Sequence, residues 1–154
     1  MRAPSKLHLE NFLPYRLSVL SNTLSGAIAA AYFAHFGLSI PEWRVMAVLA
    51  ANPGLSAAEV TARTAMDKVA VSRVVAALLA AGRLRRTTAK ADRRRTHLEL
   101  TPAGAKVYAQ VVPMALDYER HLIAPLSARD RATLDRLLRI LLGRAVELGP
   151  AHAR

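Results

Sequence analysis

Residues 67–101 carry the clearest pattern in the chain, reading DKVAVSRVVAALLAAG over 67–82 and RLRRTTAKADRRRTHLELT over 83–101. The first half has the i, i+3, i+4, i+7, i+8 apolar spacing of a core-facing helix. The residues of this stripe are Val71, Val74, Val75, Leu78 and Leu79. Asp67 is a suitable N-cap, and Gly82 stands where helices commonly end. The pattern therefore predicts an amphipathic helix between these two residues.

The opposite face of this predicted helix is small and basic. It carries Lys68, Val69, Ser72, Arg73 and Ala76. Small side chains allow a helix backbone to enter a DNA major groove deeply, and Lys68 and Arg73 could then reach base edges or phosphates. This face indicates a recognition helix.

The second half changes from helical to alternating periodicity. Leu84, and later Leu98 and Leu100, alternate with polar residues, which predicts two short strands. Between them we expect a polar loop from Thr87 to Arg95. A helix followed by a basic hairpin is the arrangement of a winged helix. The alternative is a solvated basic loop without a binding role, which we disfavour because the charge directly follows a groove-sized helix.

The composition indicates one globular chain with a polyanionic partner. The chain has 154 residues, 53% of them hydrophobic, and a formal net charge of +11. Such a charge favours nucleic acid or an anionic membrane surface as partner. The positive charge is concentrated in 83–95, where Asp92 is the one acidic residue. The absence of cysteine excludes disulfides and thiolate zinc sites.

A membrane span and a signal peptide are both disfavoured. The N-terminus is polar and lacks an apolar core followed by a cleavage site. Residues 17–41 contain no charged side chain, but serine, asparagine, threonine and glycine interrupt the apolar run. A buried helix of a cytoplasmic protein is the expectation.

The remaining chain predicts further helices on both sides of the basic hairpin. We expect helices over about 14–36, 40–51, 57–64, 102–124 and 128–148, with Ser39-x-x-Glu42 and Ser56-x-x-Glu59 as capping boxes and a kink at Pro113. The expected fold class is mainly α with a small β-hairpin wing. Residues 1–154 form a single domain in this interpretation. Its winged helix-turn-helix lobe is 38–101, and 10–37 with 102–149 form a helical dimerisation platform.

These residues resemble the MarR family of bacterial transcriptional regulators. The resemblance covers most of the chain and is strongest over 40–104. Its markers are GRLRR at 82–86, Asp92, Arg94, Leu98, Leu100, Thr101 and Gly104, together with the Asp67–Arg73 segment. Residues 12–22 and 40–44 also resemble a subgroup that controls catabolism of aromatic acids. The chain departs from the family pattern at Ala65, where a turn glycine is common, and at Thr87–Thr88.

The resemblance implies a homodimer that binds palindromic duplex DNA. An arginine at the wing tip enters the minor groove in such proteins, which implies this role for Arg94, with Asp92 holding the basic wing. The expected DNA-binding residues are Ser56, Asp67, Lys68, Val69, Ala70, Ser72, Arg73, Arg86, Asp92, Arg93, Arg94 and Arg95.

A ligand pocket is a better interpretation than an active site. No catalytic, metal-binding or cofactor-binding motif is present, and the five histidines are dispersed. Short polar groups on an apolar helix, aromatic walls and nearby arginines could orient a small aromatic carboxylate or its thioester. The expected ligand-binding residues are Arg16, Ser21, Asn22, Ser25, Trp43 and Arg44. The alternative is that the small polar residues only permit close helix packing.

Three functions can be compared with these features of the sequence. The favoured one is a ligand-responsive transcriptional regulator, a repressor, that an aromatic acid or its thioester releases from DNA. The second is a ligand-independent architectural DNA- or RNA-binding protein, although few aromatic residues lie in the basic region for base stacking. A small enzyme on a helical scaffold would need paired titratable groups, which the sequence lacks.

Overall fold

The computed structural model describes residues 6–89 and 92–149, with the side chains of 89–95 outside that description. The elements are η1 (Leu9–Asn11), α1 (Leu13–Phe36), α2 (Ile40–Ala51), α3 (Ala57–Thr64), α4 (Lys68–Ala80), β1 (Leu84–Ala89), β2 (Asp92–Leu100), α5 (Pro102–Ile123) and α6 (Ala128–Leu148). They form two compact units, Met1–Met114 and Ala115–Arg154. The predicted fold class, mainly helical with a β-hairpin wing, is confirmed.

Local capping signals set most helix boundaries. Ser39 and Ser56 each form the reciprocal capping box with the glutamate three residues later, at the starts of α2 and α3. Asp67 accepts a hydrogen bond from the backbone N–H of Ala70 at 2.8 Å and caps α4. Gly37 ends α1 in the left-handed conformation, with φ 57°. The predicted bounds of these helices are therefore confirmed.

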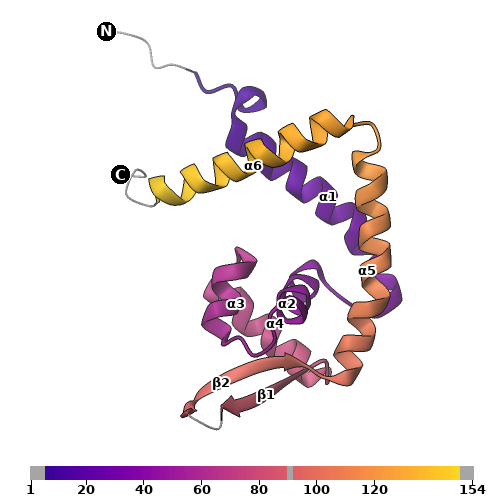
Figure 1. Cartoon of the computed structure of the whole chain (residues 1–154), viewed down its shortest axis with the longest axis vertical. Helices are drawn as coiled ribbons and strands as arrows, with labels where there is room; N and C mark the ends of the chain where they lie inside the picture. Colours follow the sequence, from indigo (N-terminus) through magenta and orange to yellow (C-terminus); the bar gives the residue numbers. More distant parts are fainter. Residues whose placement is uncertain (1–5, 90–91, 150–154) are drawn as a thin grey trace. The chain divides into compact units, whose positions relative to one another are not determined.

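Helices α2, α3 and α4 gather above the β1–β2 hairpin (Figure 1). Their contact is apolar: Val45, Leu49, Val60, Val71 and Leu78 are all fully or almost fully buried. Leu84 and Leu98 close this core from the hairpin side. The apolar stripe predicted for α4 thus faces the core, which leaves the Lys68–Arg73 side at the surface.

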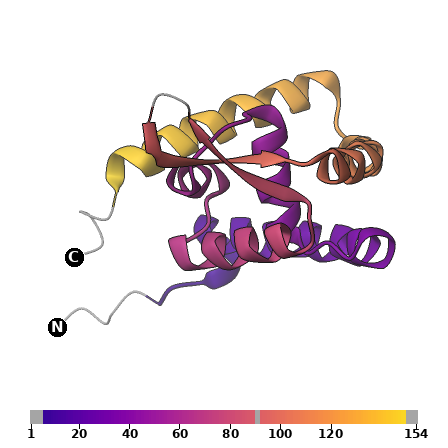
Figure 2. The same cartoon turned by 90° about the horizontal axis from the view of Figure 1, so that it is seen from below.

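The hairpin is longer than expected. The segment 87–95, predicted as a loop, is largely strand, since β1 continues to Ala89 and β2 begins at Asp92. The register pairs Leu84 with Leu100 and Thr88 with Thr96. Backbone pairing needs no apolar side chain, so threonine and arginine can extend an exposed two-stranded ribbon. Figure 2 shows this ribbon's twist from below.

A backbone link ties the base of the wing to the turn before α3. Leu98 donates a hydrogen bond to the carbonyl of Leu55 at 2.8 Å, and Gly54 donates to the carbonyl of Leu98 at 3.2 Å. The His97 ring adds a contact from Nδ1 to the Gly54 carbonyl oxygen at 2.6 Å. These bonds fix the wing relative to the helix-turn-helix.

Helix α5 begins in the first unit and ends in the second. Thr101 caps it by accepting a hydrogen bond from the N–H of Gly104 at 3.0 Å. Pro113 lies inside the helix and cannot donate a backbone hydrogen bond, and the division between the units follows one residue after it. In the second unit, Ser127 caps α6 through the N–H of Asp130.

Two helices keep much of their apolar surface uncovered. Only Tyr32 is buried on α1, and no residue is buried on α6. Of the described helices, α1 alone is long and apolar enough to cross a membrane, a test that a core helix of a soluble protein also passes. The exposed apolar residues of these helices include Leu17, Leu20, Phe33, Leu134, Leu137, Leu138, Ile140 and Leu142.

Candidate nucleic-acid interface

The exposed face of α4 carries most of the residues predicted to contact DNA. Lys68, Val69, Ser72 and Arg73 are exposed, and Ala70 is half-buried. Val69, Ser72 and Arg73 are spaced i, i+3 and i+4, so they share one side of the helix. Since the opposite side is held in the core, the helix can present only this small, basic surface to a duplex.

A groove of about 350 Å³ runs between α3 and α4 beside this face. Lys68 and Ser72 line it from α4, and Arg86 lines it from β1. Its α3 side is made of Ala57, Ala58 and Thr61, which the sequence analysis did not single out. The sequence signal that could have identified these three residues is their position directly after the Ser56 capping box. The groove therefore brings Lys68 and Arg86, predicted separately, to one place.

Two neighbouring arginines of β1 have different surroundings. Arg85 donates to Glu99 Oε2 from Nη2 at 2.9 Å and from Nε at 3.2 Å, and the two residues are paired in the strand register. Arg86 is on the other face of the strand, because successive side chains alternate. It is exposed at the groove and has no ion pair among the described residues. Arg86 is thus the arginine available to an anionic ligand.

Ser56 and Asp67, both predicted to contact DNA, use their side chains as helix caps. The Ser56 hydroxyl donates to Glu59 Oε2 at 2.7 Å and accepts from the Glu59 N–H at 3.3 Å. Hydrogen bonds from Ser56 lower the pKa of the Glu59 carboxyl, with smaller contributions from Arg63 and His97. The capping contribution is therefore present above the unfolded-state pKa of Glu59 and is lost as pH falls through the folded-state value.

The predicted wing contacts lie where the side chains are not described. Asp92, Arg93, Arg94 and Arg95 belong to β2 by backbone, with Asp92 paired to Ala89. Their side chains lie outside the described residues, so the roles assigned to Arg94 and Asp92 stay predictions.

The residues predicted to bind a ligand fall into separate groups. Arg16, Ser21 and Asn22 are exposed on the N-terminal half of α1, and Ser25, near the midpoint of the helix, is half-buried. Trp43 on α2 is half-buried, and Arg44 beside it is exposed. Asn22 is about 15 Å along the helix axis from Tyr32, where α1 contacts Trp43. Neither the α3–α4 groove nor a second hollow, between α2, β2 and α5, is lined by any of the six.

An aromatic cluster surrounds Trp43. Its ring centroid is 5.5 Å from that of Tyr32 on α1 and 5.4 Å from that of Tyr108 on α5, with the Tyr108 pair stacked at 19°. Tyr108 was not predicted from the sequence, because nothing local marks a residue that stacks on a distant helix. The Tyr32 hydroxyl is buried without a hydrogen-bond partner among the described residues, and burial raises its pKa.

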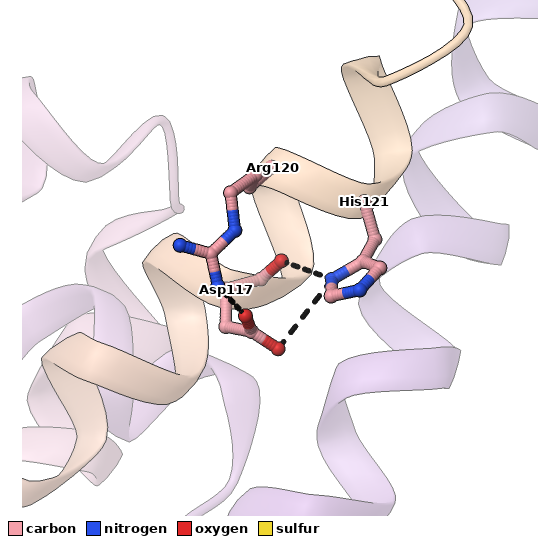
Figure 3. Close-up of polar contacts among 3 residues, drawn as sticks. All are labelled: Asp117, Arg120 and His121. Carbon is pink, nitrogen blue, oxygen red and sulfur yellow. Dashed lines mark hydrogen bonds and ion pairs between the residues drawn. The ribbon is translucent and has the colours of Figure 1, made fainter.

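A separate polar cluster on α5 is a surface feature of one helix (Figure 3). Asp117 pairs with Arg120, and His121 directs Nδ1 toward the Asp117 carbonyl oxygen at 2.8 Å and its Oδ2 at 3.4 Å. All three side chains are well exposed. Among the side chains that the structure describes, no group of three or more metal-ligating residues is assembled.

Comparisons with known proteins agree with this geometry. A family model described as MarR family matches residues 36–95. A Thauera aromatica protein assigned as the transcriptional regulatory protein for the hcr operon is 33% identical over 110 residues, covering 71% of this chain and 66% of that protein. Transcriptional regulator HosA of Escherichia coli O127:H6 is 27% identical over 105 residues, covering 68% of this chain and 78% of HosA.

A solved structure extends the likeness to the whole fold. The crystal structure of a MarR/EmrR family transcriptional regulator from Acinetobacter sp. ADP1 superposes with a TM-score of 0.84 at 25% identity, covering 90% of this chain and 97% of that one. These similar proteins are transcriptional regulators and not enzymes. From the matched family model, these relatives and the shared winged-helix fold, the chain belongs to the MarR family.

Proposed function

We propose that this protein is a ligand-responsive transcriptional repressor that binds palindromic duplex DNA as a homodimer. The observation that carries the proposal is the exposed α4 face with Lys68, Ser72 and Arg73, flanked across a groove by Arg86. Asp67 is the nearest acidic residue in sequence, and its carboxylate faces the backbone of its own helix. A small, positive helix face suits the major groove of a polyanion.

The homodimer is supported by the apolar surface of α1 and α6. Leu17, Leu20 and Phe33 are 39%, 53% and 71% exposed, and Leu142 on α6 is 68% exposed. Several large apolar side chains that a single chain leaves exposed on one helix are typical of a subunit interface. In this proposal, a platform joins two copies of the lobe 38–101. The platform consists of residues 10–37 and 102–149, which contain α1, α5 and α6. Access to DNA supports a cytoplasmic location.

The proposed effector is a small aromatic carboxylate or its thioester. The Tyr32–Trp43–Tyr108 cluster supports an aromatic ligand, because it offers ring surface on a half-buried tryptophan. Arg16, Arg44 and the polar row Ser21, Asn22 and Ser25 would supply charge and hydrogen bonds for the carboxylate. An effector bound between platform and lobe would change the spacing of the two recognition helices, which must match half-sites about 34–36 Å apart.

A competition experiment tests the DNA-binding proposal. Palindromic duplexes from the region upstream of the protein's own gene compete with random duplex of equal length for the full-length protein, over a range of salt concentrations. A repressor binds the palindrome at least about a thousandfold more tightly. The alternative, an architectural DNA- or RNA-binding protein, gives equal affinity for both duplexes. Thermal-shift screening against aromatic carboxylates and their thioesters then tests the effector, which should stabilise the folded protein by an amount that rises with the logarithm of its concentration above Kd.

A further inference from the structure

Val69 is an exposed apolar side chain that neither the core nor a dimer interface explains. It is 60% exposed on α4. From residue 38 to residue 115, it is the only large hydrophobic side chain among the described residues that is exposed. The other exposed large hydrophobic side chains lie in residues 7–33 and 116–146, within the proposed dimerisation platform or directly before it. A valine in the first turn of the recognition helix therefore needs its own explanation.

Val69 lies on the exposed α4 face, at the N-terminal end of the helix. Ser72, Arg73 and Ala76 follow at i+3, i+4 and i+7, so they lie on the same side of the helix as Val69. Ser72 and Ala76 are short, and Val69 therefore projects beyond them. Arg73 and Lys68 are long enough to reach phosphates or bases at its flanks. If a duplex takes this face into its major groove, the Val69 methyl groups are placed to meet a base edge.

The chemistry of the major groove identifies the complementary group. Its base edges present donors and acceptors, and thymine adds the one apolar group, the C5-methyl. A valine against adenine, guanine or cytosine would displace water from polar atoms without supplying a hydrogen bond, which is unfavourable. We propose that Val69 selects thymine by contact with its C5-methyl group, at one position in each half-site. This inference rests on the proposed DNA-binding function.

Replacement of thymine by deoxyuridine tests the contact, because it removes only the methyl group. The full-length protein first selects duplexes from a random library, and each thymine of the selected half-site is then changed in turn. One position should weaken binding by about fourfold per half-site, as expected for about 0.8 kcal/mol for one buried methyl group. The same change in both half-sites should weaken it by about sixteenfold.

Two protein variants show whether Val69 is responsible. Val69→Ala should show a smaller preference for the thymine duplex over the deoxyuridine duplex, because the two γ-methyl groups of Val69 are removed. Ser72→Ala, on the same face, should keep the full preference for thymine whatever its overall affinity. Circular dichroism checks that both variants fold.

Three results would overturn the inference. Wild-type affinity that no deoxyuridine substitution changes would show that no methyl group is read. An equal thymine preference in Val69→Ala and in the wild type would assign the contact to another residue. If the library yields no selected duplex at all, the proposed function itself fails and this inference with it.

Discussion

A β-carbon on Gly104 would overlap the main-chain carbonyl oxygen of Arg83, so the first turn of α5 lies directly against the corner between α4 and β1. The same corner is joined to Thr101, whose N–H donates to the Arg83 carbonyl at 3.0 Å and whose hydroxyl donates to the Gly82 carbonyl at 2.6 Å. The Arg83 guanidinium donates to the carbonyl of Phe36, at the end of α1. Three helices and the wing therefore meet at one point, through hydrogen bonds and close packing onto main-chain carbonyl groups.

Gly104→Ala should destabilise the protein, because its new methyl group meets backbone atoms that cannot move independently. Overpacking of this kind costs about 1–3 kcal/mol of the free energy of unfolding, and more where backbone must shift. Urea denaturation measures the loss. Gly26→Ala in α1 is the control: among the described residues, no atom outside the local helix lies within 4 Å of its added carbon, and helix propensity favours alanine by up to about 1 kcal/mol. Equal stabilities of the two variants would contradict the packing described here.

Ala65→Gly should stabilise the protein. Ala65, between α3 and α4, has φ 53° and is the only non-glycine residue with positive φ among the described residues. The left-handed conformation costs an L-residue about 1–2 kcal/mol, which glycine avoids. Part of this gain is offset by the greater entropy of glycine in the unfolded chain. The expected net gain is therefore below about 1 kcal/mol, measured as a higher urea midpoint.

A matched substitution separates backbone strain from a general effect of glycine. Ala62 lies inside α3, one turn before Ala65, and is exposed. Ala62→Gly should lower the free energy of unfolding by about 1 kcal/mol, because glycine is a poor helix former. If both glycine variants lose stability, the strain at Ala65 is not the controlling factor.

The sequence predicted those parts of the fold that local chemistry determines. Capping boxes at Ser39 and Ser56, the Asp67 cap and the Gly37 stop are short-range signals, and each marks an observed helix end. The departure noted at Ala65 also corresponds to a real feature, since this position does adopt the conformation that favours glycine. Family resemblance and apolar periodicity pointed to the same winged helix-turn-helix.

Features that depend on tertiary pairing could not be read from the sequence. The strands include 87–89 and 92–95 because backbone hydrogen bonds pair across the hairpin. The polar side chains of these residues lack the alternating apolar pattern by which a strand is predicted from sequence. The stacking of Tyr108 on Trp43 joins residues that are far apart in the chain. The separation of Asn22 from Trp43 along α1 likewise required knowing where α1 and α2 meet.

Arg86→Ala should weaken DNA binding, whereas Arg85→Ala should change it little. Arg86 is exposed beside Lys68 at the α3–α4 groove, and Arg85 is already paired with Glu99 on the other strand face. Losing one phosphate contact per protomer lowers the slope of log affinity against log salt by about 0.9 for each copy. Fluorescence anisotropy across a salt series measures both quantities. Comparable losses in the two variants would mean that net charge, and not the position of Arg86, governs binding.

Tyr32→Phe should raise the stability of the free protein. The Tyr32 hydroxyl is fully buried without a hydrogen-bond partner among the described residues, and such a group costs about 1–3 kcal/mol. Phenylalanine keeps the contact with Trp43 and removes the hydroxyl, so thermal unfolding should shift to higher temperature. Tyr108→Phe, at a half-buried ring that stacks on Trp43, should change stability by no more than about 0.5 kcal/mol. A destabilised Tyr32→Phe would indicate that the hydroxyl has a partner in solution.

Leu138→Glu should dissociate the proposed homodimer. Leu138 is 46% exposed on α6, in the apolar stripe with Leu134 and Leu141. Each of two symmetric copies would lose about 1.5 kcal/mol or more of apolar burial, which raises the dimer Kd by about two orders of magnitude. Sedimentation equilibrium measures the Kd. Arg136→Glu is the control, because residue 136 lies two positions earlier and so on the opposite side of the helix. An unchanged dimer Kd in Leu138→Glu would exclude this stripe from the interface. The proposed role of α6 in the dimerisation platform would then be wrong.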